Sequence, residues 1–135
     1  DPYIFEKSIL FNITLSEENI LTREELYKLK KCLEVSRVEV FYSYKKILKE
    51  THIKLREYGG ELSGGMRQRI GLCRALFQAK SFLICDEATS SIDLKNENLI
   101  IEGLKSEFRN IGIIATAHRK TMIDSFDRCI RVDKL

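Results

Sequence analysis

The chain has 135 residues, 44% of them hydrophobic and 32% charged, which is typical of one globular domain and excludes a disordered chain. The net charge is +3, with both signs mixed along the chain, so we expect no nucleic-acid partner. No run approaches the roughly 20 apolar residues that span a bilayer, and no signal peptide is visible. The four cysteines form no CxxC pair, so a zinc site is not expected.

The residues before the glycines at positions 59–65 are predicted to be helical. Thr22 and Glu25 have the spacing of a capping box, which predicts a helix over residues 23–34. Its apolar face is expected to carry Leu26, Leu29 and Leu33. A second helix is predicted over residues 37–49, although the β-branched and aromatic residues in this segment also suit a strand.

The residues after the glycines alternate between helical and strand patterns. Ser63 is placed to cap a helix over residues 64–79. The elements predicted next are apolar strands at 81–86, 111–116 and 128–132, with helices at 96–108 and 120–125 between them. Continuous apolar strands joined by helices are typical of an α/β fold with parallel strands. Functional groups are then expected at the carboxyl ends of the strands.

A serine and two glycines open the helix at residue 64. The segment reads Leu62-Ser63-Gly64-Gly65-Met66. Backbone N–H groups at a helix N-terminus attract an anion, and the missing glycine side chains would let a phosphate come close. The alternative interpretation is a loop that simply leads into a capped helix.

Two acids end the first apolar strand. Asp86 and Glu87 after four apolar residues resemble a Walker B motif, in which Asp86 would hold Mg²⁺ through water and Glu87 would orient the attacking water. The alternative is a strand that ends in solvated acids. His118 follows the second apolar run and could donate a hydrogen bond to a phosphate, or it could be structural.

Taken together, these segments resemble the ATPase domain of ATP-binding-cassette (ABC) transporters. The resemblance rests on LSGGM at 62–66, RQRIGLCRAL at 67–76, DEATSSID at 86–93, AHR at 117–119, DPYIF at 1–5 and EYGG at 57–60. The order and spacing agree along nearly the whole chain, and the last two segments point to an exporter. The resemblance implies a partial RecA-like P-loop NTPase core, over about residues 81–135, and the ABC α-helical subdomain, over about residues 9–80.

The resemblance also implies that two such domains pair head to tail and that each contributes residues to both bound nucleotides. The residues expected to contact ATP held by the partner domain are Ser63, Gly64, Gly65, Met66 and Asp93. Glu87 and His118 would act on the nucleotide of their own domain, and Asp86 on its Mg²⁺. Residues 57–60 would contact a transmembrane domain, which would place the chain at the cytoplasmic face of a membrane.

Two departures from the pattern of this family bear directly on the site. Met66 stands where the signature has glutamine, and no G-x-x-x-x-G-K-[ST] phosphate-binding loop occurs in the sequence. That loop and the Q-loop glutamine would lie before Asp1, so we expect the chain alone to bind ATP weakly, to hydrolyse none, and to expose an edge or a face of its sheet. The alternatives are an LSGG-type ATPase of DNA repair or chromosome maintenance, and a non-catalytic half-domain that only pairs with a partner.

Overall fold

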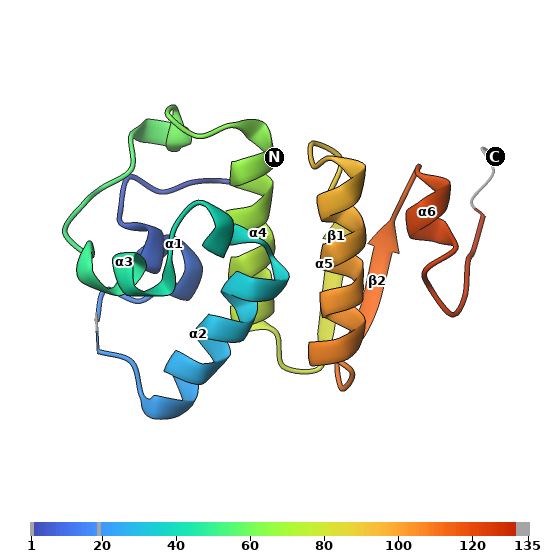
Figure 1. The fold of residues 1–135 in the computed structure, drawn as a ribbon, viewed down its shortest axis with the longest axis horizontal. Helices are drawn as coiled ribbons and strands as arrows, with labels where there is room; N and C mark the ends of the chain where they lie inside the picture. Colours follow the sequence, from blue (N-terminus) through green and yellow to red (C-terminus); the bar gives the residue numbers. More distant parts are fainter. Residues whose placement is uncertain (1, 19, 132–135) are drawn as a thin grey trace.

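The computed structural model describes residues 2–18 and 20–131 and contains helices on one side and a small sheet on the other (Figure 1). The helical side consists of α1 (Ile9–Thr14), α2 (Arg23–Val35), η1 (Val38–Val40), α3 (Tyr44–Lys49), η2 (Glu57–Gly59) and α4 (Gly64–Gln78). The other side consists of β1 (Phe82–Asp86), α5 (Leu94–Glu107), β2 (Gly112–Thr116) and α6 (Lys120–Ile123). The short segments η1 and η2 are 3₁₀-helices.

Side-chain caps fix where the two longest helices on the helical side begin. At α2, Thr22 Oγ1 accepts from the Glu25 amide at 3.2 Å, and the Glu25 carboxylate accepts from the Thr22 amide at 2.8 Å. This confirms the predicted capping box. At α4, Ser63 Oγ accepts from the Met66 amide at 3.2 Å, as the sequence predicted. Each cap satisfies a backbone donor that the first turn of a helix leaves without a partner.

The helix predicted over residues 37–49 is interrupted. Arg37 takes a left-handed conformation with φ of 61°, which ends the preceding helical path. A short 3₁₀ turn follows, and Ser43 then caps α3 by accepting from the Lys46 amide. The prediction of one continuous helix was therefore wrong, because capping by Ser43 and burial of Val38 favour two short elements.

The two strands of the sheet are parallel. Their register pairs Phe82 with Gly112 at one end and Asp86 with Thr116 at the other. Helix α5 joins them and, in Figure 1, overlaps β1 and runs roughly along the strands, as expected for an α/β fold. It begins two residues earlier than predicted, because Asp93 is its N-cap.

The strand predicted over residues 128–132 does not form within the part that the structure describes. Residues 128–131 have no regular secondary structure, and Val132 lies outside the described residues. Ile130 is largely exposed. Apolar composition alone does not make a strand, because the backbone of a strand also needs a neighbour for its hydrogen bonds.

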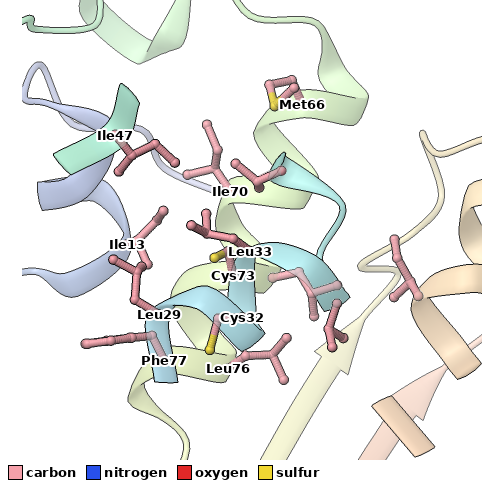
Figure 2. Packing of buried hydrophobic residues seen from close by; sticks show 14 of the residues in the cluster. Ile13, Leu29, Cys32, Leu33, Ile47, Met66, Ile70, Cys73, Leu76 and Phe77 are labelled. Atoms are coloured by element: carbon pink, nitrogen blue, oxygen red, sulfur yellow. The ribbon is translucent and has the colours of Figure 1, made fainter. Parts of the chain in front are cut away.

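The hydrophobic core is centred where α1, α2 and α4 pack together (Figure 2). The apolar residues that recur at helical spacing along α4 are all buried: Met66, Ile70, Cys73 and Phe77. The same holds along α5 and at its C-cap for Ile100, Ile101, Leu104 and Phe108. Helix α1 was not predicted; Ser8 caps it, and it packs on α4.

One face of the sheet is left uncovered. Leu83 and Cys85 point into the core, whereas the alternate positions are exposed: Phe82 by 69%, Ile84 by 75% and Ile114 by 60%. Successive side chains of a strand point to opposite faces, so these three residues share one face. The expected exposed apolar face is therefore present.

Candidate functional site

The carboxyl ends of β1 and β2 are joined by one threonine side chain. Thr116 Oγ1 donates to Asp86 Oδ1 at 2.7 Å and accepts from the Glu87 amide at 3.0 Å. Because Asp86 and Thr116 are register partners, the parallel pairing itself brings these groups together. The Asp86 carboxylate is thereby held at the exposed rim of the sheet.

Glu87 and His118 meet directly beyond the strand ends. Glu87 Oε1 lies 2.9 Å from His118 Nε2, and both side chains are largely exposed. Glu87 has φ of 47°, a left-handed conformation that costs a residue with a side chain of order 1–3 kcal/mol. The strained turn directs the chain away from the strand at this point. The structure thus brings together Asp86, Glu87 and His118, as the sequence predicted.

The glycines at the start of α4 pack against a neighbouring loop. A Cβ added at Gly65 would lie 2.9 Å from the carbonyl oxygen of Ser91, whereas one at Gly64 would meet Ser91 at an ordinary 3.7 Å. The sequence interpretation assigned both glycines to the approach of a phosphate. The structure adds that Gly65 is required for the close approach of Ser91.

The Met66 side chain is buried in the structure. It is only 5% exposed and belongs to the hydrophobic core, at one end of the group of residues drawn in Figure 2. The Met66 amide donates to Ser63 Oγ. The assignment of Met66 to ATP binding stays a prediction, and in this structure core packing holds the side chain.

Asp93 lies at the first turn of α5 with its carboxylate partly exposed. It accepts from the Asn96 side chain at 2.7 Å and from the Asn96 amide at 3.1 Å. These hydrogen bonds, assisted by the charge of Arg69, hold the pKa of Asp93 below its ordinary value. Arg69 Nη2 lies 3.8 Å from the Asp93 carboxylate.

Three buried or half-buried polar residues that hold the loop between Asp86 and Asp93 were not predicted. They are Gln68, Glu97 and Arg119. The Glu97 carboxylate is 1% exposed and accepts from Thr89 Oγ1 at 2.6 Å and from Arg119 at 3.2 Å. Gln68 and Arg119 lie inside the RQR and AHR segments, but sequence letters alone do not disclose which backbone groups such side chains bind.

A cleft of about 690 Å³ separates α4 from the exposed side of β1. Asp86, Glu87 and Ser90 are among the residues that line it, together with Pro2 and Arg74. The acids at the end of the strand therefore face an open space rather than a packed interior. This leaves room for a charged ligand beside them.

The residues present fit a magnesium ion only in combination with a ligand. No group of three or more His, Cys, Asp or Glu side chains in the described part of the chain could hold a metal by itself. Mg²⁺ is commonly bound through one or two carboxylates together with substrate phosphates. Asp86, fixed by Thr116, supplies one such carboxylate.

Comparison with known protein families decides to which family the chain belongs. The model of the family described as "ABC transporter" matches residues 2–90, about two thirds of the chain. The chain belongs to the ABC transporter family. Among residues 2–18 and 20–131, no helix is both long enough and apolar enough to cross a membrane.

The relatives of this ABC family member include export proteins from bacteria. The ATP-dependent lipid A-core flippase of Pseudoalteromonas translucida is 33% identical over 96% of the chain, which corresponds to 22% of that protein. The alpha-hemolysin translocation ATP-binding protein of Escherichia coli O157:H7 is also 33% identical over 96% of the chain, or 18% of its own length. The chain thus spans about a fifth of the length of these relatives.

A solved structure supports the fold of this ABC family member. It is a bacterial Atm1-family ABC exporter with ATP bound, which matches 91% of the chain and 20% of its own chain. The TM-score is 0.69 and the identity 25%. The names of these relatives favour a transporter over the DNA-repair alternative.

Proposed function

We propose that the chain is part of an ATP-binding and ATP-hydrolysing subunit that drives export across a membrane. The observation that carries this proposal is the juxtaposition of Glu87 and His118, 2.9 Å apart, beside the Asp86 carboxylate at the strand ends. Family membership and the export functions named for the relatives supply the reaction class.

Each of the three residues has a distinct chemical task in the proposed reaction. The Glu87 carboxylate accepts a proton from water and aims that water at the terminal phosphate. His118 holds Glu87 in place in the free protein and donates a hydrogen bond to the phosphate when ATP is bound. Asp86 would hold Mg²⁺, which would supply positive charge beside the phosphates.

The start of α4 acts on a nucleotide that a second copy of such a domain holds. Ser63 is exposed at the N-terminus of a 15-residue helix, where the helix dipole and unpaired N–H groups favour an anion. Ser91 lies beside Gly64 and Gly65, and Asp93, two residues further along the chain, lies 3.8 Å from Arg69 of α4. These residues form the surface that closes on the partner's ATP in a head-to-tail dimer.

The segment of η2 is the proposed contact with a transmembrane domain. Tyr58 is 61% exposed, so it is available at the surface, and its backbone is left-handed with φ of 54°. Tyr3 packs edge-on against it, with ring centroids 5.6 Å apart. This aromatic pair, with Glu57 and Gly60 beside it, would receive the membrane domain at the cytoplasmic face of the membrane.

ATP binding requires a phosphate-binding loop that these 135 residues do not contain. The exposed apolar face of β1 and the cleft beside it leave space for a further element next to Asp86. We therefore expect the 135-residue chain by itself to bind ATP no more tightly than millimolar and to hydrolyse none.

The proposal is tested by supplying the missing loop. The chain is fused behind, or mixed with, a segment of one relative that contains G-x-x-x-x-G-K-[ST], and phosphate release is measured with ATP and Mg²⁺. We expect hydrolysis only in the combined protein, and E87Q should reduce the rate about 10²–10⁴-fold while ATP binding persists. Micromolar ATP binding by the 135 residues alone, or equal rates with E87Q, would contradict the proposal.

A further inference from the structure

The loop of residues 87–93, here called the bridging loop, connects the acids of β1 to α5 and runs past the start of α4. Its backbone is fixed from two sides by side chains of other elements. Ser91 lies against Gly64 and Gly65, so the bridging loop touches the start of α4 and continues directly from Glu87. A shift in this loop would therefore change the spacing between the two parts of the proposed site.

Gln68, on α4, holds the bridging loop from one side. Its Nε2 donates to Ser90 Oγ at 2.8 Å, and its Oε1 accepts from the Ser91 amide at 2.8 Å. The Gln68 side chain is buried, at 7% exposure, so water competes little for these hydrogen bonds. Gln68 follows Ser63 by little more than one helical turn. A movement of the start of α4 would therefore move the bridging loop through these two hydrogen bonds.

Arg119 holds the bridging loop from the other side. It donates to the carbonyl oxygens of Ser90 at 3.0 Å and Ile92 at 2.8 Å, and its guanidinium pairs with the buried Glu97. Arg119 directly follows His118 in the chain. The same loop is thus bound to the start of α4 through Gln68 and to the segment that carries His118 through Arg119.

We propose that Gln68 is a positioning residue that keeps the start of α4 in register with Glu87 and His118 by holding the bridging loop. This inference rests on the proposed function. Gln68 touches none of the three strand-end residues and acts through Ser90 and Ser91. The side-chain amide of Gln68 both donates a hydrogen bond to the Ser90 hydroxyl and accepts one from the Ser91 N–H. A hydrophobic side chain of equal length can form neither bond.

The experiment compares Q68M with Q78M, a matched control on the same helix. Gln78 donates to the Thr14 carbonyl oxygen at 2.7 Å, far from the bridging loop, so Q78M removes a glutamine hydrogen bond without touching the loop. Hydrogen exchange of the Ser91 amide is measured by NMR in the 135-residue chain. We expect exchange to be about tenfold faster in Q68M and unchanged in Q78M.

The second measurement is ATP hydrolysis after fusion to the phosphate-binding loop. We expect kcat to fall about tenfold or more in Q68M with KM nearly unchanged, and S90A, which removes one of the two hydrogen bonds, to show a smaller loss. Faster Ser91 exchange with unchanged kcat in Q68M would overturn the positioning role and leave the proposed function intact. Absence of hydrolysis in the unsubstituted fusion would refute the proposed function itself, and this inference with it.

Discussion

Gly65 shows how a single missing side chain connects the two parts of the proposed site. The carbonyl oxygen of Ser91 occupies the space that a Cβ would need, whereas Gly64 has room for a methyl group. The sequence predicted that both glycines matter for close approach, and it could not distinguish the phosphate of a ligand from the backbone of a distant loop. That distinction depends on the contact with residue 91, which sequence spacing does not reveal.

The paired substitutions G65A and G64A test this contact. We expect G65A to lower the free energy of unfolding by about 1–3 kcal/mol, because overpacking against a backbone carbonyl forces the bridging loop to move. G64A should change it by no more than about 0.5 kcal/mol. Urea denaturation measures the free energy of unfolding of both variants. Equal changes would show that the Ser91 carbonyl does not restrict the size of the side chain at position 65.

Asp93 gives the stability of the chain a specific pH dependence. The hydrogen bonds from Asn96 lower the pKa of Asp93 in the folded state. The charged carboxylate therefore contributes fully to stability above the unfolded-state pKa of about 3.8, and this contribution is lost as the pH falls through the lower folded-state pKa. D93N keeps a capping side chain but does not titrate. We expect the melting temperature of D93N to fall less steeply than that of the unsubstituted chain below about pH 4. If the melting temperatures of the two proteins fell in parallel with decreasing pH, Asp93 would not be the source of this pH dependence.

At the scale of elements, local signals decided which predictions succeeded. Helices α2 and α4 could be predicted because a side-chain cap and a 3.6-residue apolar period coincide in each. The helix over 37–49 was wrong because a left-handed residue and a second cap divide it. The strand over 128–132 was expected from composition alone, whereas pairing depends on a neighbour that the sequence of the segment does not specify. The division into two subdomains near residue 80 stays a prediction.

The burial of one cysteine each in α2, α4 and β1 predicts the reactivity of the thiols. Burial raises the pKa of Cys32 to about 12 and of Cys85 to about 11, and it also raises that of Cys73. The thiolate is the reactive form, and these three are buried whereas Cys129 is exposed. With a disulfide reagent at pH 8, we expect Cys129 to react rapidly and the other thiols only after unfolding. Rapid reaction of all four thiols in the native chain would show that the helices do not pack as described.

At the scale of the whole molecule, the uncovered sheet face is the main structural liability. Ile84 and Ile114 are register partners on this face, and Phe82 lies beside them. An exposed apolar surface on a sheet with open edges favours association between copies. The same uncovered face is available to pack against a further structural element beside Asp86.

The double variant I84E/I114K tests this property in the 135-residue chain. The two charges lie opposite each other across the strand pair and should stabilise it slightly while removing the apolar face. Sedimentation velocity should show concentration-dependent association of the unsubstituted chain and a monomer for the double variant. L83E, on the buried face, is expected to unfold the chain instead. Equal association with and without the charges would mean that this face is not responsible.

The central claim is that the start of α4 and the end of β1 act on two different nucleotides in a head-to-tail pair. The direct measurement mixes two inactive proteins, both fused to a phosphate-binding loop: E87Q, and S63D, whose aspartate still caps α4 but repels phosphate. Each homodimer has a defect in both sites, whereas the mixed dimer has one intact site. We predict that mixing restores about a quarter of the unsubstituted activity, since half of the dimers are mixed and each has one working site of two. No recovery in a mixture that demonstrably forms mixed dimers would contradict the account.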